Sequence, residues 1–199
     1  DRIKDDFKRS IGKGYLQARE MEELVLAGQP FHIKNHRGEI IDKIYPGKIH
    51  EVFSIVVTQE RFGQIECNLA HLLEVEDDND YPWAIAVDDL ETFLITLSRK
   101  QNHLQEFVTY LTAREKLHGR LFCYDELDLG ALFLMQPKVF FSYCNHFAPV
   151  IMSPDMNNFF DDLYSIGLGF KNELHLDKKK QREAPIAYAL LKELKLGKP

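Results

Sequence analysis

The stretch Val52-Phe53-Ser54-Ile55-Val56-Val57 decides how the first half of the chain folds. Its nearly continuous apolar character is typical of a strand that is buried on both faces of a sheet. The flanking residues extend the predicted strand to 50–58. Upstream, residues 31–34 and 40–44 predict two further strands, because the sequence Asn35-His36-Arg37-Gly38 between them consists of turn-forming residues. The first half of the chain is therefore expected to be rich in sheet.

A helix is predicted over residues 2–27, ahead of these strands. Its apolar side chains recur every fourth residue, at Ile3, Phe7, Ile11 and Tyr15. Gly28 follows the last turn, where glycine commonly ends a helix. Gly12 and Gly14 weaken the prediction, since each costs about 1 kcal/mol relative to alanine inside a helix. They can equally mark a place where a neighbouring segment packs very close to the backbone.

The acidic run of residues 76–80 is the best candidate for a boundary, because its like charges favour a solvated loop. After it, a short apolar strand followed by acids and a helix occurs twice, at 84–91 and 121–128. In each, an aspartate can cap the helix and the following acids favour its N-terminal dipole. Further predicted elements are helices over 65–75, 102–117, 153–166 and 184–196 and a strand over 139–143. The predicted fold class is α+β (mixed α/β), with an α/β segment over 1–78 and a mostly helical module over 79–199.

The composition narrows the class of protein. A hydrophobic share of 45% and a charged share of 28% are those of an ordinary globular protein, and the apolar runs are too short to cross a bilayer. The net charge of −6 does not favour a polyanion partner for the whole surface, although a local basic patch can still bind one. Three widely spaced cysteines in apolar surroundings indicate reduced thiols and a cytoplasmic protein. Because the sequence opens at Asp1 within an amphipathic pattern, we expect an internal fragment or a processed chain.

Two acidic clusters are the first candidates for metal-dependent chemistry, because grouped carboxylates can hold a divalent ion. They are Asp88, Asp89 and Glu91, and Asp125, Glu126 and Asp128. Each stands where a helix begins, so capping accounts for its composition and we assign it a structural role. The histidines and cysteines lack zinc spacing, and the sequence has neither a phosphate-binding loop nor a nucleophile elbow. We therefore predict no metal ligands and no complete catalytic site in this chain.

Two groups of basic residues are candidates for contacting nucleic-acid phosphates. The first lies on the N-terminal helix and includes Lys8 and Arg9. The second is the cluster of Lys178, Lys179, Lys180 and Arg182 before the last predicted helix. In both cases an ordinary solvated, charged face is the alternative interpretation.

The order of these parts resembles a known superfamily. The segment Lys13-Gly14-Tyr15-Leu16-Gln17-Ala18-Arg19-Glu20, followed by the strand at 49–58, is similar to the stretch just downstream of the active site in PD-(D/E)XK nuclease-like proteins, including the nuclease-related domain group. In that superfamily a helix often presents a Gln or Lys to the catalytic site. The resemblance implies that Gln17 is an auxiliary catalytic residue, with Lys13 as a second. Residues 87–90, 107–114 and 124–130 also resemble a helical region of bacterial proteins that contain such a module.

The chain departs from the superfamily in the defining residues, an Asp followed by an Asp/Glu-x-Lys strand that holds the metal and activates water. Asp42-Lys43 lacks the intervening residue, and Glu66-Cys67-Asn68 has Asn where Lys is required. The resemblance thus implies that the catalytic acids lie upstream of Asp1 or in another chain. This chain would then be the C-terminal portion of a bacterial nuclease-like protein, whose intact form hydrolyses DNA or RNA phosphodiesters with Mg²⁺.

A non-catalytic protein–protein interaction module is the competing hypothesis. In it, the aromatic-rich second half packs against another subunit. The aromatic residues concerned are Phe133, Phe140, Phe141, Tyr143, Phe147, Phe159 and Phe160. The same side chains can build the protein's own core, so they do not decide between the two hypotheses.

Overall fold

The computed structural model of the chain describes residues 2–73, 75, 81–152 and 156–167. The structure has the predicted mixed α+β class. Among the described residues, the strands form three two-stranded sheets, and most of the part after residue 86 is helical.

The chain begins with a continuous helix, which confirms the predicted N-terminal helix. It consists of α1 (Arg2–Phe7), a π-helical segment η1 (Lys8–Gly12) and α2 (Lys13–Leu26). Gly28 follows its end with a φ of +73°, in the left-handed region that favours glycine, and its N–H donates to the carbonyl of Val25 (3.1 Å). Phe7, Ile11 and Tyr15 are buried, so the predicted apolar stripe is the side on which the helix packs.

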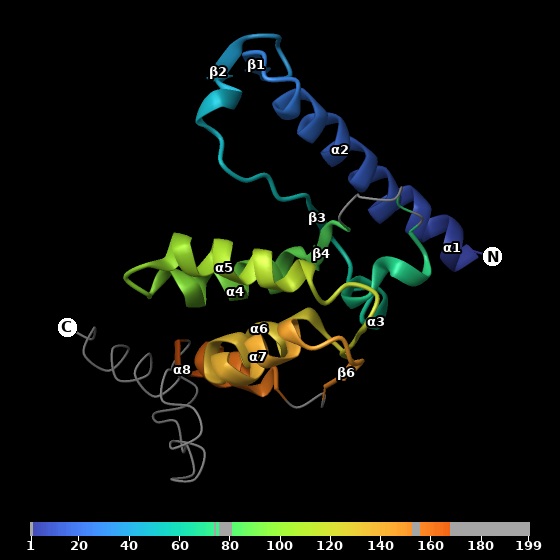
Figure 1. Cartoon of the computed structure of the whole chain (residues 1–199), viewed down its shortest axis with the longest axis vertical. Helices are drawn as coiled ribbons and strands as arrows, with labels where there is room; N and C mark the ends of the chain where they lie inside the picture. Colours follow the sequence, from blue (N-terminus) through green and yellow to red (C-terminus); the bar gives the residue numbers. More distant parts are fainter. Residues whose placement is uncertain (1, 74, 76–80, 153–155, 168–199) are drawn as a thin grey trace.

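A β-hairpin follows the helix. β1 (Phe31–Lys34) and β2 (Ile40–Ile44) pair antiparallel, as predicted, with Phe31 opposite Ile44. A 3₁₀ turn, η2 (Pro46–Lys48), ends the hairpin. The chain then runs back as an extended segment to the next strand (Figure 1).

The strand predicted over 50–58 is shorter in the structure, where β3 covers only Ile55–Thr58. β3 pairs in parallel with β4 (Trp83–Ala86), and that partner is four residues long, so only these positions find a neighbour. The predicted burial on both faces is also wrong, because Val56 is buried but Val57 is 47% exposed. β3 precedes the acidic run and β4 follows it, so one sheet joins the two predicted segments. Their division at residue 78 stays a prediction.

The remaining described elements are α3 (Gln64–Cys67), η3 (Leu69–His71), α4 (Val87–Ser98), α5 (His103–Glu115), β5 (Leu121–Phe122), α6 (Glu126–Met135), α7 (Pro137–Asn145), β6 (Val150–Ile151) and α8 (Asn158–Gly167). β5 and β6 pair in parallel. We call α3 to α8, with β4 to β6 between them, the body. We call α2 and the β1–β2 hairpin the arm, which extends away from the body (Figure 1).

Three further predicted elements differ from the structure. Residues 139–143 lie in α7 instead of a strand, because Pro137 begins a helix and Phe140 and Cys144, four residues apart, are both buried. The helix predicted over 65–75 is interrupted at Asn68, whose side-chain amide donates to the carbonyl of Leu121 (3.0 Å). α8 begins at Asn158, after a turn at 156–157, and the predicted start at 153 lies outside the described residues. The acidic run at 76–80 and the helix at 184–196 lie outside the described residues.

The body is built around a single aromatic core. Phe93 packs against Tyr110 with ring centroids 4.7 Å apart, and Tyr110 is stacked on Phe140. Of the seven aromatic residues in the competing hypothesis, four are buried in this core and two are packed against it at partial burial. The seventh, Phe147, is 98% exposed. A second, smaller cluster of buried residues joins the N-terminal helix to β3 and β4.

A buried ion pair holds the body together. Glu126 and Arg114 are 3% and 1% exposed, and Arg114 Nε donates to Glu126 Oε1 (2.7 Å). The same oxygen accepts from Trp83 Nε1 (2.7 Å) and from the Tyr110 hydroxyl (3.0 Å). Arg114 Nη2 also donates to the carbonyl of Cys67 (2.7 Å). One carboxylate therefore links β4, α5 and α6, and its arginine reaches α3.

The three cysteines Cys67, Cys123 and Cys144 are buried free thiols, which agrees with the prediction of reduced thiols in a core. Burial raises the pKa of Cys144 above its usual value. The thiols are therefore core side chains and not reactive groups at the surface.

Candidate functional site

A pocket of about 500 Å³ lies between the N-terminal helix and the end of β3. Its helical wall consists of Arg9, Ser10, Lys13, Gly14 and Gln17, and its other wall of Val56, Val57, Thr58, Gln59, Glu60 and Phe62. Three candidate site residues of the N-terminal helix therefore line one pocket. They are Arg9, predicted to contact phosphate, and Lys13 and Gln17, the predicted auxiliary catalytic residues.

The helix lies directly on the strand because of one glycine. A Cβ atom on Gly14 would be 2.8 Å from Val56 Cγ1, closer than side chains approach one another. The sequence left open whether the glycines weaken the helix or allow a neighbouring segment to pack close to it. At Gly14 the second interpretation holds. At Gly12 the nearest atom to an added Cβ would be 3.9 Å away, so no such contact explains that glycine.

Lys13 and Gln17 flank this close contact. They are four residues apart, so they lie on the same face of α2, and both are exposed. Their polar ends are available to a molecule in the pocket, since neither side chain is consumed by packing. Arg9, also exposed, lies one turn before Lys13 in the π-helical segment.

The turn after β3 forms the other wall of the pocket. A buried acid, Glu66, stabilises this turn through two hydrogen bonds. Glu66 Oε1 accepts from the Phe62 backbone N–H (2.7 Å) and from the Thr58 hydroxyl (3.1 Å). Glu66 is 3% exposed, and this burial raises its pKa to about 7. It lies on α3 and not on a strand, so it positions the pocket wall and does not copy the Asp/Glu-x-Lys strand.

β3 presents an open edge to the same region. The Trp83 N–H donates to the carbonyl of Ser54 (2.8 Å), which places β4 on the side of Ser54 and Val56. In a parallel pair the backbone groups of the intervening residues, Ile55 and Val57, point to the opposite side. No strand of the described chain pairs with that side. An open edge beside a pocket is a place where a further strand can add.

The charges of the pocket favour an anion. Among the described residues that line the pocket, Arg9 and Lys13 are two cations against one carboxylate, that of Glu60, and Gln17 and Gln59 add neutral donors and acceptors. Mg²⁺ binds carboxylate and other oxygen ligands, usually one or two carboxylates plus substrate phosphates. Among the residues that the structure describes, no group of three histidine, cysteine or acidic side chains could hold a metal ion. The described residues of the pocket therefore do not fit Mg²⁺ by themselves.

The two acidic clusters act in the fold. Asp125 caps α6 as predicted, since its Oδ1 accepts from the Leu127 N–H (2.7 Å). The predicted aspartate cap of α4 is wrong, because Ala86 occupies that position. Asp89 instead pairs with Arg61 (2.5 Å) at 2% exposure, and burial raises its pKa to about 6.

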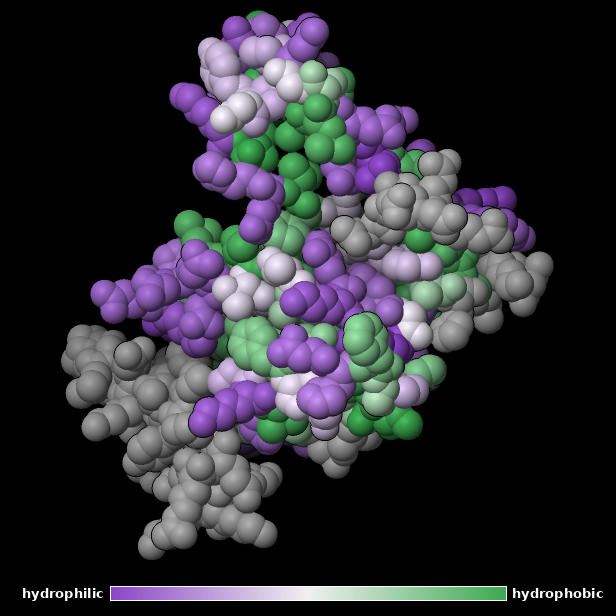
Figure 2. All heavy atoms as spheres, viewed as in Figure 1, coloured by the Kyte–Doolittle hydropathy of each residue, from purple (hydrophilic) through white to green (hydrophobic). Residues whose placement is uncertain are grey.

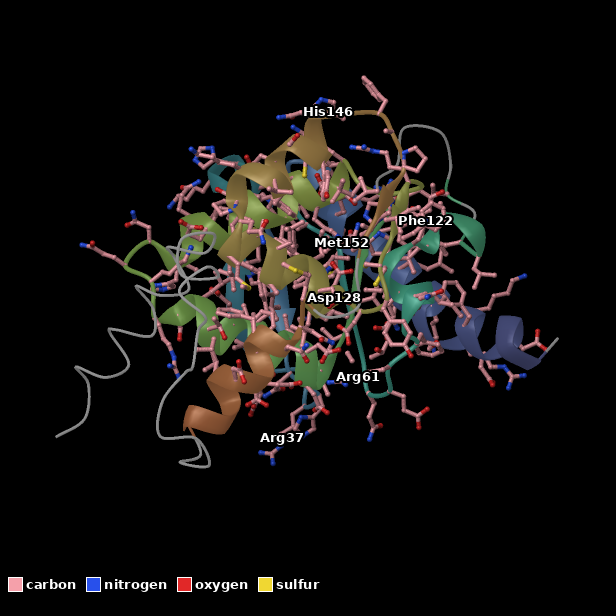
Figure 3. All side chains as sticks on the ribbon, turned by 90° about the horizontal axis from the view of Figure 1, so that it is seen from below. Arg37, Arg61, Phe122, Asp128, His146 and Met152 are labelled. Carbon is pink, nitrogen blue, oxygen red and sulfur yellow. The ribbon has the colours of Figure 1, made fainter. Side chains whose placement is uncertain are left out.

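Asp128, the last acid of the second cluster, is fully buried. Its Oδ1 accepts from the Asn157 backbone N–H (2.8 Å), and burial raises its pKa above the usual value. Figure 3 shows it inside the body, with Arg61 nearer the edge.

The other predicted nucleic-acid contacts are not in the pocket. Lys8 is exposed but does not line it. Lys178, Lys179, Lys180 and Arg182 lie outside the described residues. Sequence reasoning missed Thr58, Gln59 and Glu60, although Thr58 ends the core strand and the other two directly follow it. The carboxyl end of a parallel strand is where such folds gather functional side chains, and that signal could have found them.

No protein-family model, curated protein or solved structure matches this chain. Over the described residues, none of the helices combines the length and the apolar character needed to cross a membrane.

Proposed function

We propose that this chain forms the rear of the active site in a bacterial, cytoplasmic nuclease-like protein that hydrolyses DNA or RNA phosphodiesters. The observation that carries the proposal is the pocket, in which the exposed Lys13 and Gln17 stand beside the open edge of β3. The resemblance to PD-(D/E)XK proteins implies a role at the catalytic site for the same two residues, Gln17 and Lys13.

In this proposal the catalytic acids that hold Mg²⁺ belong to a segment outside residues 1–199 or to another chain, since Glu60 is the only carboxylate among the described residues that line the pocket. That segment adds to the open edge of β3 and covers apolar side chains of the arm. Met21 and Leu24 are 46% and 47% exposed on α2, and Val57 is 47% exposed on β3. Exposed apolar surface of this kind marks a place where another segment packs.

The residues of this chain act on the phosphate. The Lys13 ammonium offsets the negative charge of a phosphodiester in the pocket. The Arg9 guanidinium, one turn earlier on the helix, adds a second positive charge. The Gln17 amide both donates and accepts hydrogen bonds, so it can orient a phosphate oxygen or the attacking water. Both act by position and charge, and neither takes a proton.

Cleavage of labelled single- and double-stranded DNA and RNA by the protein of the complete reading frame, with Mg²⁺ or with EDTA, tests the proposal. We expect metal-dependent cleavage that Gln17→Ala lowers by about tenfold or more. Gln105→Ala is the matched control, because Gln105 is an exposed glutamine on α5. A folded protein that cleaves none of the substrates, or one in which the two variants behave alike, contradicts the proposal.

A non-catalytic interaction module remains the second candidate function, favoured by the exposed apolar residues of the arm and by Phe147. In that case the segment that covers the arm belongs to another protein subunit. The complete protein would then bind its partner but would cleave no nucleic acid.

A further inference from the structure

The β1–β2 hairpin is a basic element on an acidic chain. Residues 31–50 contain four lysine and arginine residues against two acids, whereas the whole chain has a net charge of −6. The four cations are Lys34, Arg37, Lys43 and Lys48, and all are exposed. Figure 2 shows hydrophilic side chains over the outer end of the hairpin. This charge favours a polyanion at the tip of the arm.

The turn of the hairpin fixes the backbone at Arg37. Asn35 Oδ1 accepts from the backbone N–H groups of Arg37 (2.8 Å) and Glu39 (3.1 Å), and Asn35 Nδ2 donates to Glu39 Oε2 (2.6 Å). Gly38 completes the turn at a φ of +79°. The amide of Asn35 thus engages the neighbouring acid, and Figure 3 shows Arg37 pointing outward from the hairpin.

An aromatic ring lies close to two of the cations. Tyr45 is 48% exposed, and the ammonium groups of Lys43 and Lys48 lie 5.2 Å and 5.6 Å from its ring centroid. Cation–π contacts at exposed sites are weak, so a ligand that offers each lysine a phosphate can displace it from the ring. The ring is then free to stack while the lysines hold the backbone on either side.

We propose that the hairpin binds single-stranded nucleic acid. A base stacks on Tyr45, Lys43 and Lys48 contact the flanking phosphates, and Arg37 contacts a further phosphate along the strand. Unpaired bases offer faces to an aromatic ring, whereas the bases of a duplex are stacked on one another and acidic lipids offer none. The inference rests on the proposed function for the kind of polyanion, and it adds a substrate-binding element that the pocket does not contain.

The hairpin is well separated from the pocket. From Lys13 to Leu26 the helix rises by roughly 20 Å, at 1.5 Å per residue. A strand held at both places therefore spans several nucleotides, and each contact can be removed without disturbing the other.

The test is fluorescence anisotropy of residues 1–199 with a labelled 20-mer of thymidine and an abasic 20-mer with the same phosphates. We expect Tyr45→Leu to weaken binding of the thymidine strand by about tenfold. Binding of the abasic strand should change by less than about twofold, and Tyr45→Phe should keep both affinities. Tyr124→Leu is the matched control, because Tyr124 is 62% exposed at a distance in sequence from the hairpin.

Lys43 and Lys48 are tested by a second measurement, the salt dependence of binding. Lys43→Gln with Lys48→Gln should weaken binding of both strands and lower the salt dependence of log K by roughly 1.4, about 0.7 for each lost phosphate contact. Lys138→Gln, an exposed lysine on α7, should leave the slope unchanged. Equal effects of Tyr45→Leu and Tyr124→Leu overturn the inference. Binding to phosphatidylserine vesicles without binding to the thymidine strand also overturns it.

The two proposals fail in different ways. If the complete protein cleaves and Gln17→Ala lowers cleavage while the hairpin variants bind normally, only the hairpin inference is wrong. If the hairpin variants lose binding but the complete protein cleaves nothing, only the nuclease proposal is wrong.

Discussion

The body and the arm use polar side chains in opposite ways. In the body, Glu126 is 3% exposed and its carboxylate accepts from Trp83, Tyr110 and Arg114. In the pocket at the base of the arm, Lys13 and Gln17 are exposed on a helix that a glycine holds against β3. Charges that hold a fold are buried and paired, whereas polar groups that serve a ligand are left accessible on a rigid support.

The two regions also differ in how completely they are covered. The aromatic core of the body is enclosed by its own helices. On the arm, Leu26, Ile40 and Ile41 are each more than half exposed, and Figure 2 shows hydrophobic side chains gathered near the hairpin. The body also exposes apolar side chains, at Leu104, Phe147 and Ile151, but it has an enclosed core, whereas no residue of β1 or β2 is buried.

The largest effect is expected in the body. Arg114→Met should lower the free energy of unfolding by about 3–5 kcal/mol, because it leaves the Glu126 carboxylate buried without its cation. Arg114→Met with Glu126→Leu should recover part of the loss, since no charge is then buried. Urea denaturation followed by the fluorescence of Trp83, the chain's single tryptophan, measures both.

Arg61→Met is the control for this pair, because Arg61 is 57% exposed and Asp89 can take up a proton when it loses its partner. It should cost about 1 kcal/mol or less. If Arg114→Met costs no more than Arg61→Met, the buried network does not hold the body.

The next effect concerns the support of the pocket. Gly14→Ala should lower stability by about 1–3 kcal/mol, because its Cβ would collide with Val56 and push α2 away from β3. Gly12→Ala has room for its Cβ, so it should be neutral or stabilising by up to about 1 kcal/mol. Thermal unfolding of the two variants makes the comparison. Equal losses would show that the helix does not depend on this close contact.

A smaller effect depends on pH. The pKa of Glu66 rises from 4.5 to about 7 on folding, so the folded state keeps a proton that the unfolded chain loses between these values. The stability that this proton provides is full below pH 4.5 and is lost as pH rises through 7. Glu66→Gln keeps the oxygen that accepts from Thr58 and Phe62 and removes the charge. It should raise stability by roughly 2 kcal/mol at pH 8 and by much less at pH 4.5.

Denaturation of wild type and Glu66→Gln at the two pH values measures this difference. A gain that is the same at both would mean that Glu66 is already ionised in the folded protein.

The smallest effect is expected at the residues proposed to act on substrate. Lys13→Ala and Gln17→Ala should each change the free energy of unfolding by less than about 0.5 kcal/mol, because both side chains are exposed. Lys138→Ala provides the reference for an exposed lysine on a helix of the body. A loss well above 1 kcal/mol at either pocket residue would make it structural and would remove the contrast with Glu126.

The sequence predicted the elements of the pocket because their signals are local. The four-residue repeat of Phe7, Ile11 and Tyr15 defines the helix face, and the run ending at Thr58 defines the strand. That Lys13 and Gln17 share one face of the helix follows from their four-residue spacing, whereas their role in a site is implied only by the resemblance to PD-(D/E)XK proteins and stays a prediction. By contrast, the partners of Glu126 lie 12 to 43 residues away in the sequence, so neighbouring residues gave no sign of the network.

The wrong predictions have physical causes of the same kind. The length of β3 is set by its partner β4, not by its own apolar run. Residues 139–143 have strand-forming side chains, but Pro137 and the burial of Phe140 and Cys144 on one helix face override that preference. α4 begins at Val87, before both aspartates, so Ala86 takes the cap position and Asp89 lies in the first turn, where it pairs with Arg61.

Amide hydrogen exchange of β3 tests most directly whether the pocket is half of a site that another segment completes. In residues 1–199, the Val57 amide on the open edge should exchange nearly as fast as a loop amide, while Val56 on the β4 side is protected. In the protein of the complete reading frame, a strand added at this edge should slow exchange of Val57 by on the order of 100-fold and leave Val56 little changed. Equally fast exchange of Val57 in both proteins would contradict the claim, because β3 would then have no second partner.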